Sequence, residues 1–176
     1  MDKINFISFP RTATTYCCEA FKIALPNYHS QIIYHKIDSL KKEKNVVTVV
    51  RKPELAIRST LEIYKKNDVD LYLDWYIEFM EETLNRLDDI FVTTFDEVTN
   101  DINKVINKYC MKKNIKNPHL INTKFLLDRL KTSCPGNIPA KRKYKTFEKK
   151  ILYSNKFSTA NNIYNKILKS IVELPG

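Results

Sequence analysis

Near the start of the chain, an arginine and three threonines follow a short apolar segment. The apolar run that begins at Ile4 ends at Arg11, and Thr12, Thr14 and Thr15 come before a helical pattern. Hydroxyl and guanidinium groups donate hydrogen bonds to anions. The first N–H groups of a helix have no partner inside the helix and lie at the positive end of its dipole. A strand that is followed by a turn and then by the N-terminus of a helix therefore predicts a site for a phosphate or sulfate group.

This segment differs from the common nucleotide-binding loop. That loop needs two glycines and a lysine before a serine or threonine, because the glycines let the backbone wrap around phosphates. The chain has two glycines, Gly136 and Gly176, and neither lies in the segment. Its basic residue, Arg11, precedes the turn. A Mg²⁺-dependent nucleotide or nucleoside kinase of the P-loop group is therefore the weaker alternative.

A second anion-binding pattern follows the run Val46-Val47-Thr48-Val49-Val50. This β-branched run predicts a central parallel strand that is covered on both faces. Arg51 comes directly after it, Pro53 suits the first position of a helix, and Ser59 falls on that helix. An arginine fork and a helix hydroxyl can both reach one phosphate. Taken alone, Arg51 could instead cap the C-terminus of a helix.

Two further polar points also follow expected strands. His35 comes after the segment Gln31–Tyr34, and the pair Thr94-Phe95 ends the segment Ile90–Phe95. Histidine has an unperturbed pKa of about 6.5, so it can accept a proton at neutral pH. His35 is therefore able to act as a general base, and the alternative is a plain polar residue at a strand end.

Expected strands alternate with expected helices along the chain. Helices are predicted from the first loop to Pro26, from Pro53 to Lys66, from Leu71 to Leu87, from Val98 to Lys113, from Asn122 to Lys131 and from Ser158 to Val172. A polar connection is expected from Asp38 to Asn45 and a long basic loop from Thr132 to Thr146. The alternation predicts an α/β fold of three layers, α/β/α, around a parallel sheet of about four to five strands. Ligands of such sheets lie beyond the carboxyl ends of the strands, where all four polar points should converge.

Length and charge limit the remaining possibilities. The chain has 176 residues, so one domain spanning 1–176 is expected. Its formal net charge of +10 favours anionic partners, and a non-catalytic binder of nucleic acid or glycan is a second alternative. The sequence has no apolar run long enough to span a membrane and no signal peptide, so a cytoplasmic location is expected. Its four cysteines, at Cys17, Cys18, Cys110 and Cys134, lack metal-binding spacing and are expected to be reduced thiols.

The first motif resembles a loop of a known enzyme family. Pro10-Arg11-Thr12-Ala13-Thr14-Thr15-Tyr16 resembles the 5′-phosphosulfate loop of sulfotransferases, which reads roughly Pro-Lys/Arg-Ser-Gly-Thr-Thr-Trp/Tyr. These enzymes use 3′-phosphoadenosine 5′-phosphosulfate (PAPS). The chain has Ala13 where the family prefers glycine, and a turn that needs positive φ would be strained there. The segment Val49–Ser59 resembles the family's 3′-phosphate motif, with Ser59 eight residues after Arg51.

The resemblance implies a P-loop-like sulfotransferase fold and transfer of a sulfonate from PAPS to a hydroxyl or an amine, leaving 3′,5′-ADP (PAP). The acceptor would be a small molecule or a glycan, with no specific nucleic acid and no metal ion required. The oligomeric state is left open. The implied catalytic residues are His35 and Arg11. The implied cofactor-binding residues are Arg11, Thr12, Ala13, Thr14, Thr15, Tyr16, Arg51, Ser59 and Phe95, with Lys141, Arg142 and Lys143 in the position of the family's lid.

Overall fold

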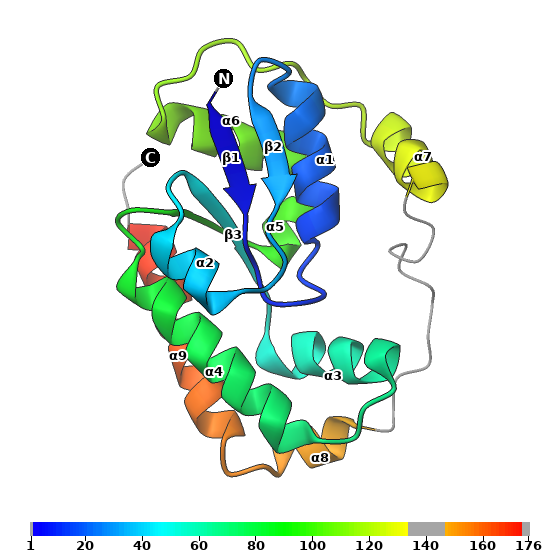
Figure 1. The fold of residues 1–176 in the computed structure, drawn as a ribbon, viewed down its shortest axis with the longest axis vertical. Coiled ribbons are helices and arrows are strands. Elements are labelled where there is room, and N and C mark those ends of the chain that lie inside the picture. Colours follow the sequence, from blue (N-terminus) through cyan, green and yellow to red (C-terminus); the bar gives the residue numbers. More distant parts are fainter. Residues whose placement is uncertain (1, 134–146, 174–176) are drawn as a thin grey trace.

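The fold is built on a four-stranded sheet whose strands all run parallel (Figure 1). The computed structural model describes residues 2–133 and 147–173. The strands are β1 (Lys3–Phe6), β2 (His29–Ile32), β3 (Val46–Val50) and β4 (Phe91–Thr94), and their order in the sheet is β2-β1-β3-β4. The predicted parallel α/β sheet is confirmed.

Helices cover both faces of this sheet. They are α1 (Thr14–Ala24), α2 (Ile37–Lys42), α3 (Pro53–Tyr64), α4 (Val69–Asn85), α5 (Phe95–Asn100), α6 (Ile102–Lys112), α7 (Thr123–Ser133), α8 (Glu148–Leu152) and α9 (Phe157–Glu173). Side chains of β3 alternate between two cores: Val47 and Val49 pack with α1 and α6, whereas Val46 and Val50 pack with α3, α4 and α9. The expected three layers are therefore present.

The order of the strands defines where a ligand can enter. The chain passes from β1 outward to β2 and then crosses back to β3, on the other side of β1. The direction of winding thus reverses between β1 and β3. Open parallel sheets bind ligands at such a reversal, beyond the carboxyl ends of the two strands, because the loops there diverge to opposite faces.

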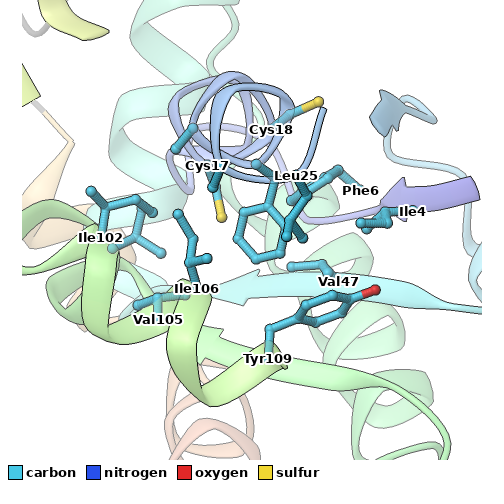
Figure 2. Packing of buried hydrophobic residues seen from close by; sticks show 14 of the residues in the cluster. Ile4, Phe6, Cys17, Cys18, Leu25, Val47, Ile102, Val105, Ile106 and Tyr109 are labelled. Carbon is cyan, nitrogen blue, oxygen red and sulfur yellow. The ribbon is translucent and has the colours of Figure 1, made fainter. Parts of the chain in front are cut away.

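The core between α1, the sheet and α6 is rich in aromatic side chains and thiols (Figure 2). The ring of Phe21 contacts the rings of Phe6 and Tyr109 edge-on, each with centroids 5.1 Å apart. Cys17 and Cys18 lie on α1 within this core and, with Cys110, are free thiols, as expected. Burial raises the pKa of Cys18 to about 12, so these thiols pack as small apolar side chains.

The second strand lies two residues earlier than the sequence pattern predicts. β2 pairs with β1 in the register Lys3↔His29 to Phe6↔Ile32. Because β1 ends at Phe6, the residues after Ile32 pass the end of their partner strand. Tyr34 is therefore outside the sheet, and His35 follows the strand by three residues instead of directly.

Three helical segments also differ from expectation. The polar stretch from Asp38 to Asn45 contains most of α2, whose one fully buried side chain, Leu40, packs against the α4 side of the sheet. The helix expected from Val98 to Lys113 is two helices, because Asp101 leaves the helical conformation and caps α6 by accepting from the Lys104 N–H. The pattern did not predict α8.

The expected basic loop is seen in part. Thr132 and Ser133 belong to the last turn of α7 instead of a loop. The remaining expected loop positions, 134–146, lie outside the described residues and include the predicted lid residues Lys141, Arg142 and Lys143. No helix in the described ranges has the length and apolar character needed to cross a membrane.

Replacing Phe21 with alanine should lower the free energy of unfolding by about 3–5 kcal/mol, because it leaves a cavity between α1, β1 and α6. Urea denaturation followed by circular dichroism measures the change. The matched control is Phe125→Ala on α7, whose side chain is 58% exposed and should change stability by about 0.5 kcal/mol or less. Equal losses in the two variants would contradict this assignment of the core.

Candidate functional site

The loop after β1 has a backbone shape suited to an anion. Arg11 and Ala13 have positive φ angles, 65° and 66°, and Thr12 between them does not. Such alternation turns successive N–H groups toward one side and forms a concavity that binds anions. Alanine is strained in this region relative to glycine, so the strain expected at Ala13 is present.

The helix that follows this loop leaves its N-terminus open. Ala13 is the N-cap of α1 and supplies no side-chain hydrogen bond, and the first turn has no acidic residue. By contrast, Asp68 caps α4 and Thr94 forms a capping box with Glu97 at α5. The first N–H groups of α1 and the positive end of its dipole therefore remain available to an anion.

The threonines of the loop divide into two kinds. The hydroxyl of Thr12 donates to the carbonyl of Phe9 at 2.8 Å, and it lies 3.2 Å from the hydroxyl of Thr14. Both side chains are buried and hold the shape of the loop itself. Thr15 is half-buried and makes no side-chain hydrogen bond within the described residues, whereas Tyr16 packs against the α1 core. Among the three hydroxyls, that of Thr15 is thus the one left to an incoming group.

Arg51 lies beside this loop. Its Nη1 donates to the carbonyl oxygen of Arg11 at 2.9 Å, and its guanidinium carbon stands 4.0 Å from the centre of the Phe95 ring. The hydroxyl of Tyr76 donates to the backbone carbonyl of Arg51 at 2.6 Å. A carbonyl, a ring face and a phenol from three other segments therefore fix Arg51 at the carboxyl end of β3.

His35 reaches the same loop from the other side. Its Nδ1 lies 2.5 Å from the carbonyl oxygen of Ser8, and its ring stands 6.4 Å from that of Trp75. Because a carbonyl can only accept, Nδ1 carries a proton and Nε2 of the neutral ring has the free electron pair. Burial lowers the pKa of His35, and the bond to Ser8 partly opposes this effect. The imidazole is therefore neutral at pH 7.

The structure brings together some of the sequence-predicted residues and separates others. Arg11, Arg51 and Phe95 are linked by the contacts above, and His35 joins them through Ser8. Ser59 lies in the middle of α3, half-buried, and no hydrogen bond within the described residues joins it to Arg51. Its role at a phosphate stays a prediction.

Sequence reasoning missed Ser8, Trp75 and Tyr76. Tyr76 is fully buried, and its place in the helical pattern indicates only a core side chain. Nothing in the neighbouring sequence indicates its hydrogen bond to the Arg51 carbonyl. Trp75 is half-buried and packs on Phe9 at 5.0 Å while it also faces His35.

Two hollows in the described structure lie away from this site. One, of about 640 Å³, lies at the amino ends of the strands and is lined by residues such as Lys3, Lys44 and Asn45. The other, of about 500 Å³, lies near Asp68 and Ser154. The amino ends of parallel strands are not where α/β sheets bind ligands, so the loops after β1 and β3 remain the better candidate.

The fold is similar to that of a solved sulfotransferase. The crystal structure of mouse sulfotransferase SULT7A1 complexed with PAP superposes with a TM-score of 0.51 at 11% sequence identity, covering 98% of this chain and 85% of that chain. No family model matches the sequence. No curated protein matches it either. The likeness establishes a sulfotransferase-like α/β fold.

Replacing Ala13 with glycine should raise the free energy of unfolding by about 0.5–1 kcal/mol, because glycine adopts positive φ without strain. Thermal or urea unfolding measures this gain. The control is Ala20→Gly in the interior of α1, which should lose about 1 kcal/mol because its backbone is right-handed helix. A loss of stability in Ala13→Gly would contradict the strained loop.

Proposed function

We propose that the chain is a sulfotransferase that moves a sulfonate group from PAPS to a hydroxyl, or to an amine, of an acceptor. The observation that carries the proposal is the contact between Arg51 Nη1 and the carbonyl of Arg11. It joins the two motifs that resemble the family's 5′ and 3′ phosphate motifs at the winding reversal of the sheet. The fold shared with a PAP-bound sulfotransferase supports the same conclusion.

The residues present suit a donor with a charged group at each end. The open N-terminus of α1 and the alternating φ angles at Arg11 and Ala13 suit the 5′-phosphosulfate. Arg51, with Ser59 as the predicted second donor, would hold the 3′-phosphate that distinguishes PAPS from ATP. Phe95 keeps the Arg51 guanidinium in place through its ring face. Lys141, Arg142 and Lys143 stay predicted lid residues.

When bound, PAPS supplies the sulfonate group that passes to the acceptor. His35 Nε2 would take the proton from the attacking hydroxyl, since Nδ1 is already occupied by the Ser8 carbonyl. Arg11 and the first N–H groups of α1 would neutralise the negative charge that grows on the departing side. Catalysis would then come mainly from positioning and fixed electrostatics, as in phosphoryl transfer.

PAP should raise the melting temperature of the protein, and the effect should exceed that of ATP with Mg²⁺. A ligand at 100 times its Kd adds about 2.7 kcal/mol to stability. Arg51→Ala should abolish the PAP effect and leave the fold intact, since Tyr76 bonds to the backbone carbonyl of Arg51, which the substitution keeps. Differential scanning fluorimetry measures these shifts.

The control for this experiment is Arg129→Ala. Arg129 is an exposed arginine on α7 that pairs with Glu19 at 3.4 Å, and its loss should leave the PAP effect unchanged. A larger shift with ATP and Mg²⁺ would favour the kinase alternative. Stabilisation by DNA that disappears with salt, without any response to PAP, would favour the non-catalytic binder.

The rate of sulfonate transfer should be flat from about pH 7 upward and should fall about tenfold per pH unit in acid. The proton acceptor must be neutral, and burial places the pKa of His35 below its usual value of about 6.5. His35→Ala should lower kcat by about 10²–10⁴-fold and spare PAP binding. The control His29→Ala, at an exposed histidine in β2, should keep its turnover. Turnover retained in His35→Ala would exclude His35 as the base.

A further inference from the structure

The end of β1 is joined to β3 by side chains where the regular pairing stops. The Ile7 N–H donates to the Val47 carbonyl at 3.1 Å, and a regular parallel ladder would continue from the Val49 N–H to the Ile7 carbonyl. Instead, the Val49 N–H donates to the hydroxyl oxygen of Ser8 at 2.8 Å, and the hydroxyl of Thr48 donates to the Ile7 carbonyl at 2.8 Å. Two hydroxyl groups thus replace one ladder bond.

This exchange has a geometric consequence for the loop. Both Ser8 and Thr48 are fully buried, so water does not compete for these bonds. The hydroxyl of Ser8 ties its own residue to β3, which limits rotation of the peptide group that follows. The carbonyl of that peptide group is the one that accepts from His35 Nδ1.

We propose that Ser8 is a positioning residue, whose hydroxyl holds the Ser8 carbonyl against His35 Nδ1 and so keeps the His35 Nε2 electron pair available for the acceptor's proton. The proposal rests on the proposed function for its role in turnover. Its structural part, the link from β3 through Ser8 to one tautomer of His35, depends only on the two hydrogen bonds of Ser8 described above.

His35 lies outside the helices and strands, in a strained part of the backbone. It follows the end of β2 by three residues and has a φ angle of 35°, which is unfavourable for a side chain with a Cβ. Its ring neighbours, Tyr34 and Trp75, lie edge-on to it, and within the described residues neither of them forms a hydrogen bond with the imidazole. The Ser8 carbonyl is the contact that selects between the two ring nitrogens.

The test is the tautomer of His35, measured by ¹⁵N NMR of the imidazole nitrogens at a pH where the ring is neutral. The signal is assigned by its loss in His35→Ala. In the unchanged protein, the Nδ1–H form should dominate. In Ser8→Ala, the signal should move toward that of an unconstrained imidazole, in which the two neutral tautomers are mixed. The value of kcat should fall by roughly 10–10²-fold. Ser8→Thr, which keeps a hydroxyl, should restore the Nδ1–H form.

Thr48→Val is the matched control. It removes the neighbouring buried hydroxyl from the same junction, and it should lose stability to a similar extent without changing the tautomer of His35. The proposal is overturned if Ser8→Ala keeps the Nδ1–H form, or if Thr48→Val alters the tautomer as much as Ser8→Ala does. If Ser8→Ala does not fold, Ser8→Cys replaces it, since its weaker sulfur acceptor should give a partial move of the same signal.

The two proposals can fail separately. An unconstrained His35 in the unchanged protein, together with a normal PAP shift, would remove Ser8 as a positioning residue and leave the sulfotransferase proposal standing. A constrained His35 that responds to Ser8→Ala, in a protein that shows no response to PAP, would remove the sulfotransferase proposal and keep the structural link.

Discussion

The hydrogen bond from Arg51 to the Arg11 carbonyl is the contact on which the candidate site depends. It can form because β1 and β3 are neighbours in the sheet although β2 lies between them in the chain. Since the winding reverses between these strands, the two loops leave toward opposite faces of the sheet, and open parallel sheets bind ligands at such a reversal. The basic side chain that ends β3 thereby comes against the backbone that starts the anion-binding loop.

Two features of the loop after β1 reduce local stability. Ala13 adopts a left-handed conformation, and α1 begins without a side-chain cap, while α4, α5 and α6 have capped starts. An uncapped start typically costs about 1 kcal/mol, and a strained residue costs a similar amount. The buried β3 strand and the aromatic core behind α1 offset these costs. An anion at the loop would recover part of them by bonding to the free N–H groups.

The sequence predicts the parallel sheet and the place of Arg51 at the end of β3 well because their signals are local. The β-branched run before Arg51 identifies a strand buried on both faces, and the small residues after Arg11 identify a strand-to-helix turn. The sequence does not predict Ser8 or Tyr76 as site residues, because their partners lie far away along the chain. Nor does it predict that Thr12 donates into its own loop, since the same hydroxyl could equally face a ligand.

The candidate anion site and His35 are positioned by different parts of the sheet. The loops after β1 and β3, which form the candidate anion site, lie at the centre of the sheet, whereas His35 follows β2 at its edge. Edge loops tolerate change better than central ones because fewer elements pack on them. The hydrogen bond between His35 Nδ1 and the Ser8 carbonyl joins the histidine to the central loop. Tyr34, which is exposed in the edge loop beside His35, can therefore be replaced while the central loops keep their geometry.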